Sequence, residues 1–75
     1  MNTITTVDAR GQSCPGPLVA LHKALREVGQ GDLVELLASD PGSRSDVPSW
    51  ARLTGNRLIE ATVESEVFRF VLQKA

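Results

Sequence analysis

Residues 17–38 read PLVALHKALREVGQGDLVELLA and join a helical pattern to a strongly apolar strand pattern. The apolar residues of the first half recur at helical spacing and form one stripe: Leu18, Leu21, Ala24, Leu25 and Val28. Gly29 to Gly31 ends the helix. Asp32 to Ser39 is strongly apolar, with Leu33, Val34, Leu36, Leu37 and Ala38, which predicts a central strand. We therefore expect an amphipathic helix that runs directly into the middle of a sheet.

The chain before this stretch predicts another strand. Thr3 to Ala9 is rich in Thr and Val, and Val7 and Ala9 share a face opposite Asp8. A loop over residues 10–13 leads to the helix. A strand, a crossover helix and a second strand form a right-handed parallel unit in nearly every known case.

The chain after the central strand predicts a second helix, from Ser43 to Thr54. Ser43 or Ser45 is the expected cap. Pro48 would cost about 3 kcal/mol in a helix interior, so we expect regular helix to start only near Asp46. The face toward the core holds Val47, Trp50, Ala51 and Thr54. We expect Trp50 to pack in the core or at its edge, with a partner contact as the alternative.

Two closing strands complete the predicted fold. Gly55 marks the helix end, and Leu58–Val63 and Val67–Leu72 flank a tight turn at residues 64–66. The element order is β-α-β-α-β-β. We predict an α/β (α+β) two-layer sandwich, a four-stranded mixed sheet with two helices on one face.

The other face of this sheet is expected to be open. Side-chain alternation places Val34, Leu36, Ala38, Phe68, Phe70 and Leu72 toward the helices. The outer face then mixes Leu33, Leu37 and Val71 with Glu35 and Arg69. Such a half-apolar face is a candidate docking or dimer surface. The alternative is that these positions are scattered and carry no function.

Size and composition restrict the function classes. The chain has 75 residues, 41% hydrophobic and 23% charged, which predicts one globular domain over residues 1–75. The apolar runs are too short for a transmembrane helix, and the N-terminus does not resemble a signal peptide. One cysteine allows no internal disulfide and indicates reducing, cytoplasmic surroundings.

The charge balance disfavours nucleic acid as a direct partner. The net charge is −1, and no dense basic run occurs. Aromatic residues for base stacking are few, at Trp50, Phe68 and Phe70. We expect no membrane partner, and a monomer or weak dimer in solution.

The most informative segment is Cys14-Pro15-Gly16-Pro17, immediately before the first helix. Proline suits a first helical turn because its missing N–H would be unpaired there anyway. A helix that begins at Pro15 or at Pro17 places the Cys14 sulfur near its positive end, which favours the thiolate. The Gly16 amide is expected to be free to face an anion. The alternative reading of a lone cysteine is a small buried hydrophobe.

Other cysteine chemistry is disfavoured by what the chain lacks. A dithiol cycle needs a second cysteine. His22, the single histidine, lies two turns beyond Cys14 and is a poor general base for it. One Cys and one His, with scattered carboxylates such as Asp40, do not make a metal site. Arg10 could favour an anion or an acidic partner, or simply be solvated. A thiolate that accepts and hands over a group remains.

These residues resemble the TusA (SirA-like) family of sulfur-carrier proteins. The resemblance covers nearly the whole chain and rests on the Cys-Pro-x-Pro signature in its setting. The matching residues are Asp8-Ala9, Gly11, Cys14-Pro15-x-Pro17, Gly31-Asp32, Asp40-Pro41, Ser45-Asp46-Val47-Pro48 and Lys74. Two features depart from relatives: Gly16 stands where several carry an acidic or larger residue, and the last turn lacks a glycine.

The resemblance implies a two-layer sandwich and a sulfurtransferase-like function. Cys14 would carry sulfane sulfur as a persulfide in the Pro15, Gly16 and Pro17 setting, without a cofactor. The donor would be a cysteine desulfurase or a rhodanese-like protein. The acceptor would belong to tRNA thiolation, cofactor biosynthesis or sulfur oxidation. The chain would be a carrier in a sulfur relay rather than a stand-alone enzyme. The alternative function is a non-catalytic protein-binding or regulatory module that uses the open sheet face.

Overall fold

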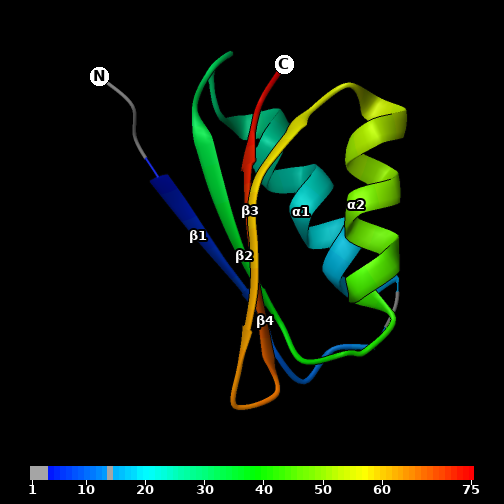
Figure 1. Cartoon of the computed structure of the whole chain (residues 1–75). Helices are drawn as coiled ribbons and strands as arrows, with labels where there is room; N and C mark the ends of the chain where they lie inside the picture. Colours follow the sequence, from blue (N-terminus) through cyan, green and yellow to red (C-terminus); the bar gives the residue numbers. More distant parts are fainter. Residues whose placement is uncertain (1–3, 14) are drawn as a thin grey trace.

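A computed structural model describes residues 4–13 and 15–75 of the chain. The elements along it are β1 (Ile4–Ala9), α1 (Gly16–Glu27), β2 (Leu33–Ala38), α2 (Ser43–Thr54), β3 (Arg57–Glu64) and β4 (Val67–Gln73). This confirms the β-α-β-α-β-β order predicted from the sequence (Figure 1). Within the described residues, no helix is both long and apolar enough to cross a membrane.

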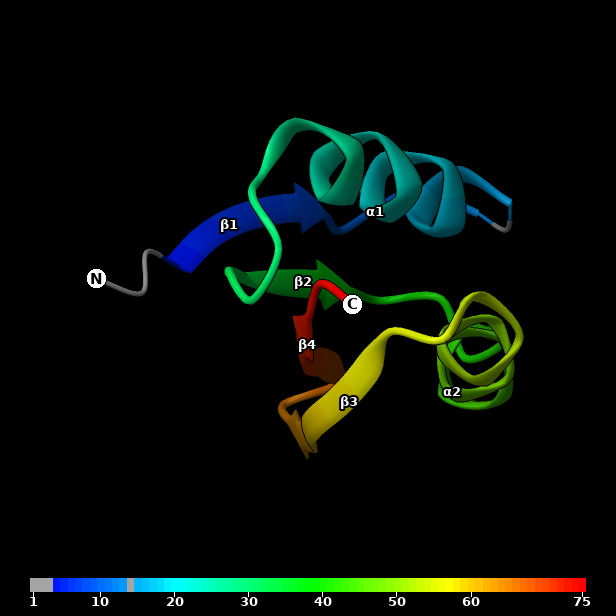
Figure 2. The ribbon, with the colours of Figure 1, turned by 90° about the horizontal axis from the view of Figure 1, so that it is seen from above.

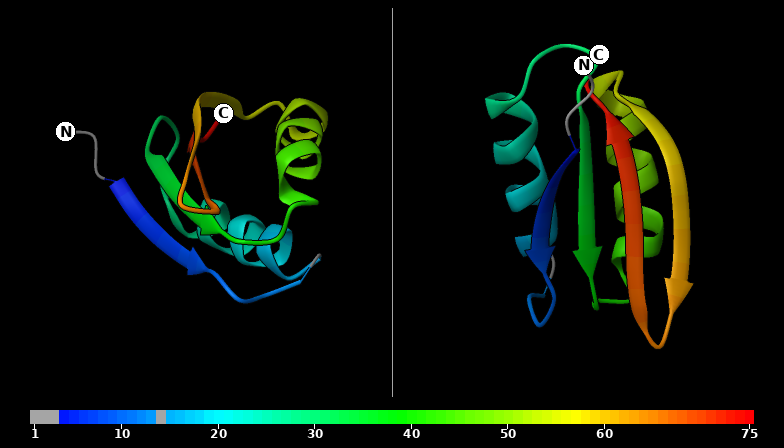
Figure 3. Two further views of the ribbon diagram at one scale, coloured as in Figure 1. Left: turned by 60° about the horizontal axis from the view of Figure 1, so that its bottom comes forward. Right: turned by 90° about the vertical axis from the view of Figure 1, so that its left-hand side faces the viewer.

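The four strands form one mixed sheet with the order β1-β2-β4-β3. β1 and β2 are parallel, as the crossover through α1 requires, while β2 pairs antiparallel with β4 and β4 with β3. Both helices cover the same face, α1 over β1 and β2, and α2 over β3 and β4 (Figures 2 and 3). The predicted two-layer architecture is confirmed.

The core lies between the sheet and the helices. Its fully buried side chains come from five elements and include Ala9, Leu21, Val34, Val47 and Leu72. The predicted inward alternation of β2 and β4 is confirmed, since Val34, Leu36, Ala38, Phe68, Phe70 and Leu72 are all buried. Trp50 is half-buried and packs against this core from its edge.

The bounds predicted for α2, Ser43 to Thr54, are confirmed, but the expected delay of regular helix until near Asp46 is wrong. Pro48 lies inside the helix rather than in its first turn. Gly42 occupies the cap position, and the Ser43 side chain is buried, so the predicted Ser43 or Ser45 cap is wrong. The early start is held by local bonds, among them Asp46 N–H to Gly42 O at 3.0 Å. One proline removes a single helical bond. The predicted Gly55 C-cap is confirmed, with φ at +78°.

The open face of the sheet is less apolar than the sequence suggests. A row of polar side chains crosses all four strands: the Thr6 hydroxyl donates to Glu35, and Arg69 bonds to both Glu35 and Glu60. The hydrogen bonds from Arg69 and Thr6 hold the pKa of Glu35 below its usual value. Val71, expected to be exposed, is only 5% exposed. Its cross-strand neighbours are Glu35 and Glu60, which belong to this row.

The hairpin between β3 and β4 turns without glycine. Its two central residues, Ser65 and Glu66, have φ of +50° and +65°. Two positive φ values are the signature of a type I′ turn, the geometry that matches the twist of paired strands. The hairpin prediction is therefore confirmed, and the chain adopts this turn with residues that favour it less than Asn-Gly.

We expect Glu66→Gly to stabilise the protein by about 0.5–1 kcal/mol. Glycine removes the steric cost of a left-handed backbone, which exceeds its own entropic disadvantage there. Urea unfolding measures the change. Thr62→Gly, in the neighbouring strand, is the control and should destabilise. A loss of stability in Glu66→Gly would contradict the turn assignment.

Candidate functional site

The candidate site lies at the end of the molecule where β1 and β2 finish and both helices begin. The Ser65–Glu66 turn lies at the same end (Figure 1; Figure 3, right). Cys14, the predicted site residue, lies outside the described residues. The loop before it, residues 10–13, and the first turn of α1 after it are described.

The structure starts α1 between the two predicted positions, Pro15 and Pro17, and at neither of them. The helix begins at Gly16, with Pro15 in the cap position and Pro17 as a buried second residue. Val19 N–H donates to Pro15 O at 2.9 Å. The expectation of a free Gly16 amide is wrong, because this N–H donates to Ser13 O at 2.8 Å. The bond joins the end of the loop to the first residue of α1.

The positive end of the α1 dipole is not neutralised by its own side chains. The first turn of α1 carries no acidic residue, whereas that of α2 carries Asp46. A helix amino end without an acidic side chain favours a nearby negative charge. The start of α1 is therefore the better suited of the two for an anionic sulfur.

Gly16 and Gln12 are in close contact at this helix start. A Cβ added at Gly16 would lie 2.9 Å from Gln12 Oε1 and 3.1 Å from Gln12 Cβ. The Gln12 side chain thus occupies the space that a larger residue at position 16 would take. Glycine at position 16, the departure from the family pattern, therefore goes together with the Gln12 side chain that lies against it.

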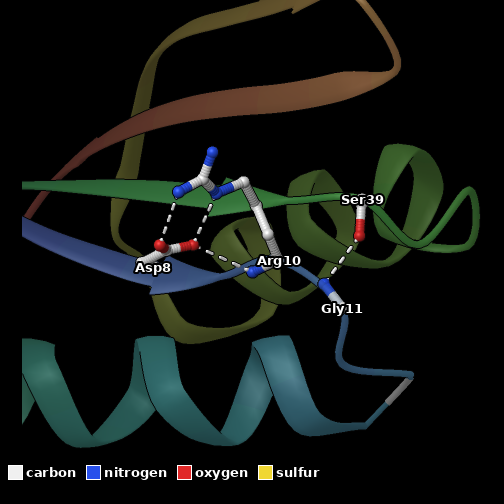
Figure 4. A network of polar contacts seen from close by, with 4 residues as sticks. All are labelled: Asp8, Arg10, Gly11 and Ser39. Carbon is white, nitrogen blue, oxygen red and sulfur yellow. Dashed lines mark hydrogen bonds and ion pairs between the residues drawn. The ribbon is translucent and has the colours of Figure 1, made fainter.

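The loop before Cys14 begins with an ion pair between Asp8 and Arg10 (Figure 4). Arg10 Nε and Nη2 donate to the two Asp8 carboxylate oxygens, each at 2.8 Å, and Arg10 N–H donates to Oδ1 at 3.1 Å. These bonds lower the pKa of Asp8 to about 2. The Arg10 guanidinium thus binds the carboxylate two residues away while its side chain stays about half exposed.

A second contact ties the same loop to β2. Gly11 N–H donates to Ser39 Oγ at 2.8 Å, across 28 positions of sequence (Figure 4). The φ of Gly11 is +80°, a conformation that glycine adopts without strain. Gln12 N–H donates to Ala9 O at 3.2 Å and completes the turn out of β1. Sequence analysis missed Ser39, although its place directly after a strand parallel to β1 was a usable signal.

His22 and Trp50 form an edge-to-face pair between the two helices. Their ring centroids are 5.9 Å apart and the planes cross at 89°. His22 is exposed on α1. The prediction that His22 is a flank residue agrees with this packing, which engages its ring with Trp50. Among residues 4–13 and 15–75, no cluster of three or more His, Cys, Asp or Glu could hold a metal ion.

We expect the Asp8 carboxyl to titrate near pH 2 and to return toward its ordinary value of 3.8 in Arg10→Gln. Because the folded-state pKa is depressed, the pair's contribution to stability is present above about pH 3.8 and disappears as pH falls through about 2. Carbon-detected NMR of the Asp8 carboxyl measures both values. An ordinary Asp8 midpoint in the unmodified protein would contradict the ion pair in solution.

Comparison with known proteins places this geometry in a family. The family model for sulfurtransferase TusA matches residues 5–74. A protein of Archaeoglobus fulgidus is 42% identical over 71 residues, covering 95% of this chain and 97% of that protein. The sulfur carrier protein TusA of Allochromatium vinosum is 36% identical over 69 residues, covering 92% and 91%.

A solved structure agrees with these sequence matches. The SirA-like protein of Desulfitobacterium hafniense superposes with a TM-score of 0.82 at 32% identity, covering 95% of this chain and 96% of that one. The family model, the relatives and the solved structure all indicate the same family. The chain belongs to the TusA (SirA-like) family.

Proposed function

We propose that this protein is a sulfur carrier and that Cys14 bears the sulfur as a persulfide. One observation carries the proposal: in a chain of the TusA family, the single cysteine directly precedes the amino end of α1. Pro15, Gly16 and Pro17 form the rigid start of that helix. Residues 1–75 act as one carrier domain, without a cofactor.

Loading is an exchange between two sulfur atoms. The Cys14 thiolate attacks the terminal sulfur of a donor persulfide, R–S–SH. A bond forms between Cys14 Sγ and that sulfur, and the donor S–S bond breaks. The products are Cys14–S–SH and the donor thiolate, so charge and atoms balance without an external oxidant or reductant. The rate depends on the thiolate fraction of Cys14.

Delivery repeats the exchange in the opposite role. An acceptor thiolate attacks the terminal sulfur of Cys14–S–SH, and Cys14 leaves as a thiolate. A persulfide is more acidic than a thiol, so the loaded carrier is anionic at neutral pH. The unneutralised amino end of α1 stabilises both anions, by about 0.3–1 kcal/mol for a surface-exposed charge.

The exchange requires a sulfur-donor protein and a sulfur-acceptor protein. A cysteine desulfurase or a rhodanese-like protein is the proposed donor, and an enzyme of tRNA thiolation, cofactor biosynthesis or sulfur oxidation the proposed acceptor. Both must reach the end of the molecule where α1 begins. A reduced, cytoplasmic setting suits a carrier whose one thiol must stay free.

The open sheet face supports the alternative function less than the sequence suggested. The row formed by Thr6, Glu35, Arg69 and Glu60 crosses it, and Val71 is buried. A non-catalytic binding module would need this face rather than the cysteine. No observation on the described residues favours it over sulfur transfer.

Incubation with a persulfide donor should raise the mass of the protein by about 32 Da, the mass of one sulfur atom bound in a persulfide. Reductant should reverse the change, and Cys14→Ser should show none. Intact-protein mass spectrometry measures both. Equal labelling of the two proteins, or none of the unmodified protein by any persulfide donor, would contradict the proposal.

Charge at position 16 should control the acidity of Cys14. We expect Gly16→Glu to raise the Cys14 thiol pKa by about 0.5 unit relative to Gly16→Gln, since a carboxylate would oppose the helix dipole. Both side chains must displace Gln12 equally, so the pair isolates the charge. The pH dependence of alkylation measures the pKa. Identical midpoints would show that the helix end does not stabilise the thiolate.

A further inference from the structure

We propose that Ser39 is a positioning residue for sulfur transfer: its hydroxyl holds the loop that delivers Cys14 to the start of α1. This inference rests on the proposed function. Ser39 is exposed and lies directly after β2. It contributes nothing to the core. Replacing it by alanine, which is of similar size, therefore tests the loop rather than the fold.

The sheet register brings Ser39 to this loop. β1 and β2 are parallel, and their last paired residues are Ala9 and Ala38. The chain leaves β1 at the same level at which Ser39 follows β2. Gly11 N–H has passed the end of the backbone ladder, and the Ser39 hydroxyl accepts from it at 2.8 Å. A side chain thus continues the strand pairing beyond the last backbone pair.

The other described backbone contacts of this loop are local. Arg10 N–H bonds to Asp8, Gln12 N–H to Ala9, and Gly16 N–H to Ser13. Such bonds set the internal shape of the turn but do not fix it against the rest of the protein. The Ser39 contact ties the turn to a neighbouring strand that is itself anchored in the core through Val34 and Leu36.

Loss of this tie should act on the cysteine through geometry. The benefit of a helix amino end falls off within the first turn. A loop that drifts away from that end leaves the sulfur with a more ordinary acidity. The helix end changes the thiolate fraction of an exposed cysteine by at most about fivefold at neutral pH. This sets the largest loss that Ser39→Ala can cause.

The test measures alkylation of Cys14 by iodoacetamide across pH in Ser39→Ala. We expect the midpoint to move toward about 8.5, the value of a free thiol, and the rate at pH 7 to fall by up to about fivefold. Ser39→Thr keeps the hydroxyl and should restore both. Ser49→Ala, at an exposed position on α2, is the matched control and should change neither.

A second measurement keeps the test decisive if Ser39→Ala is also less stable. Amide exchange at Gly11 should accelerate, while Val34 and Leu36 remain protected. An unchanged alkylation midpoint in Ser39→Ala overturns the inference, whatever happens to its stability. The reagent needs no sulfur donor. The result therefore stands apart from the mass experiment, and a carrier that fails to load sulfur would refute the proposed function alone.

Discussion

The parallel pairing of β1 with β2 is the constraint on which the site depends. It requires α1 to cross over the sheet, so the chain must leave β1 and enter the helix at one end of the molecule. It also sets Ser39 beside the loop that makes this turn. A register shift of one residue would turn Val34 and Leu36 out of the core and move Ser39 away from Gly11. Core packing and loop position are therefore specified together.

The elements and their order follow from the sequence because each has a strong local signal. Helical spacing in residues 18–28, an apolar run in residues 33–38 and the break at residues 40–42 suffice for most of the fold. The range of α2 follows from the sequence, but the delayed start inferred from Pro48 does not hold, because bonds to the preceding loop outweigh the preference of Pro48 for a first turn. The hairpin was predictable only in outline, since Ser65 and Glu66 give no turn signal.

In the candidate site, too, some residues could be predicted from the sequence and others could not. Motif and composition predict Cys14 and its prolines, because a lone cysteine before a Pro-rich helix start is a local pattern. The roles of Arg10 and Ser39 depend on which residues of the same chain they contact. The Arg10 guanidinium could have faced an anion, and only the structure shows its two bonds to Asp8. Ser39 acts across 28 positions. A contact of that range follows from strand register, which the sequence alone does not fix.

A carrier with one sulfur must show the same atom to its donor and to its acceptor. The two partners therefore compete for one end of the molecule, and neither complex can be long-lived if sulfur is to move on. This favours small interfaces, of the size seen in transient encounters. The polar row across the open sheet face is consistent with small interfaces, because it leaves this face without a continuous apolar surface. On the proposal that Cys14 bears the sulfur, both partners must reach the start of α1, and residues around it would set specificity. Gly16 and Gln12, which lie against each other there, are placed to contribute to it.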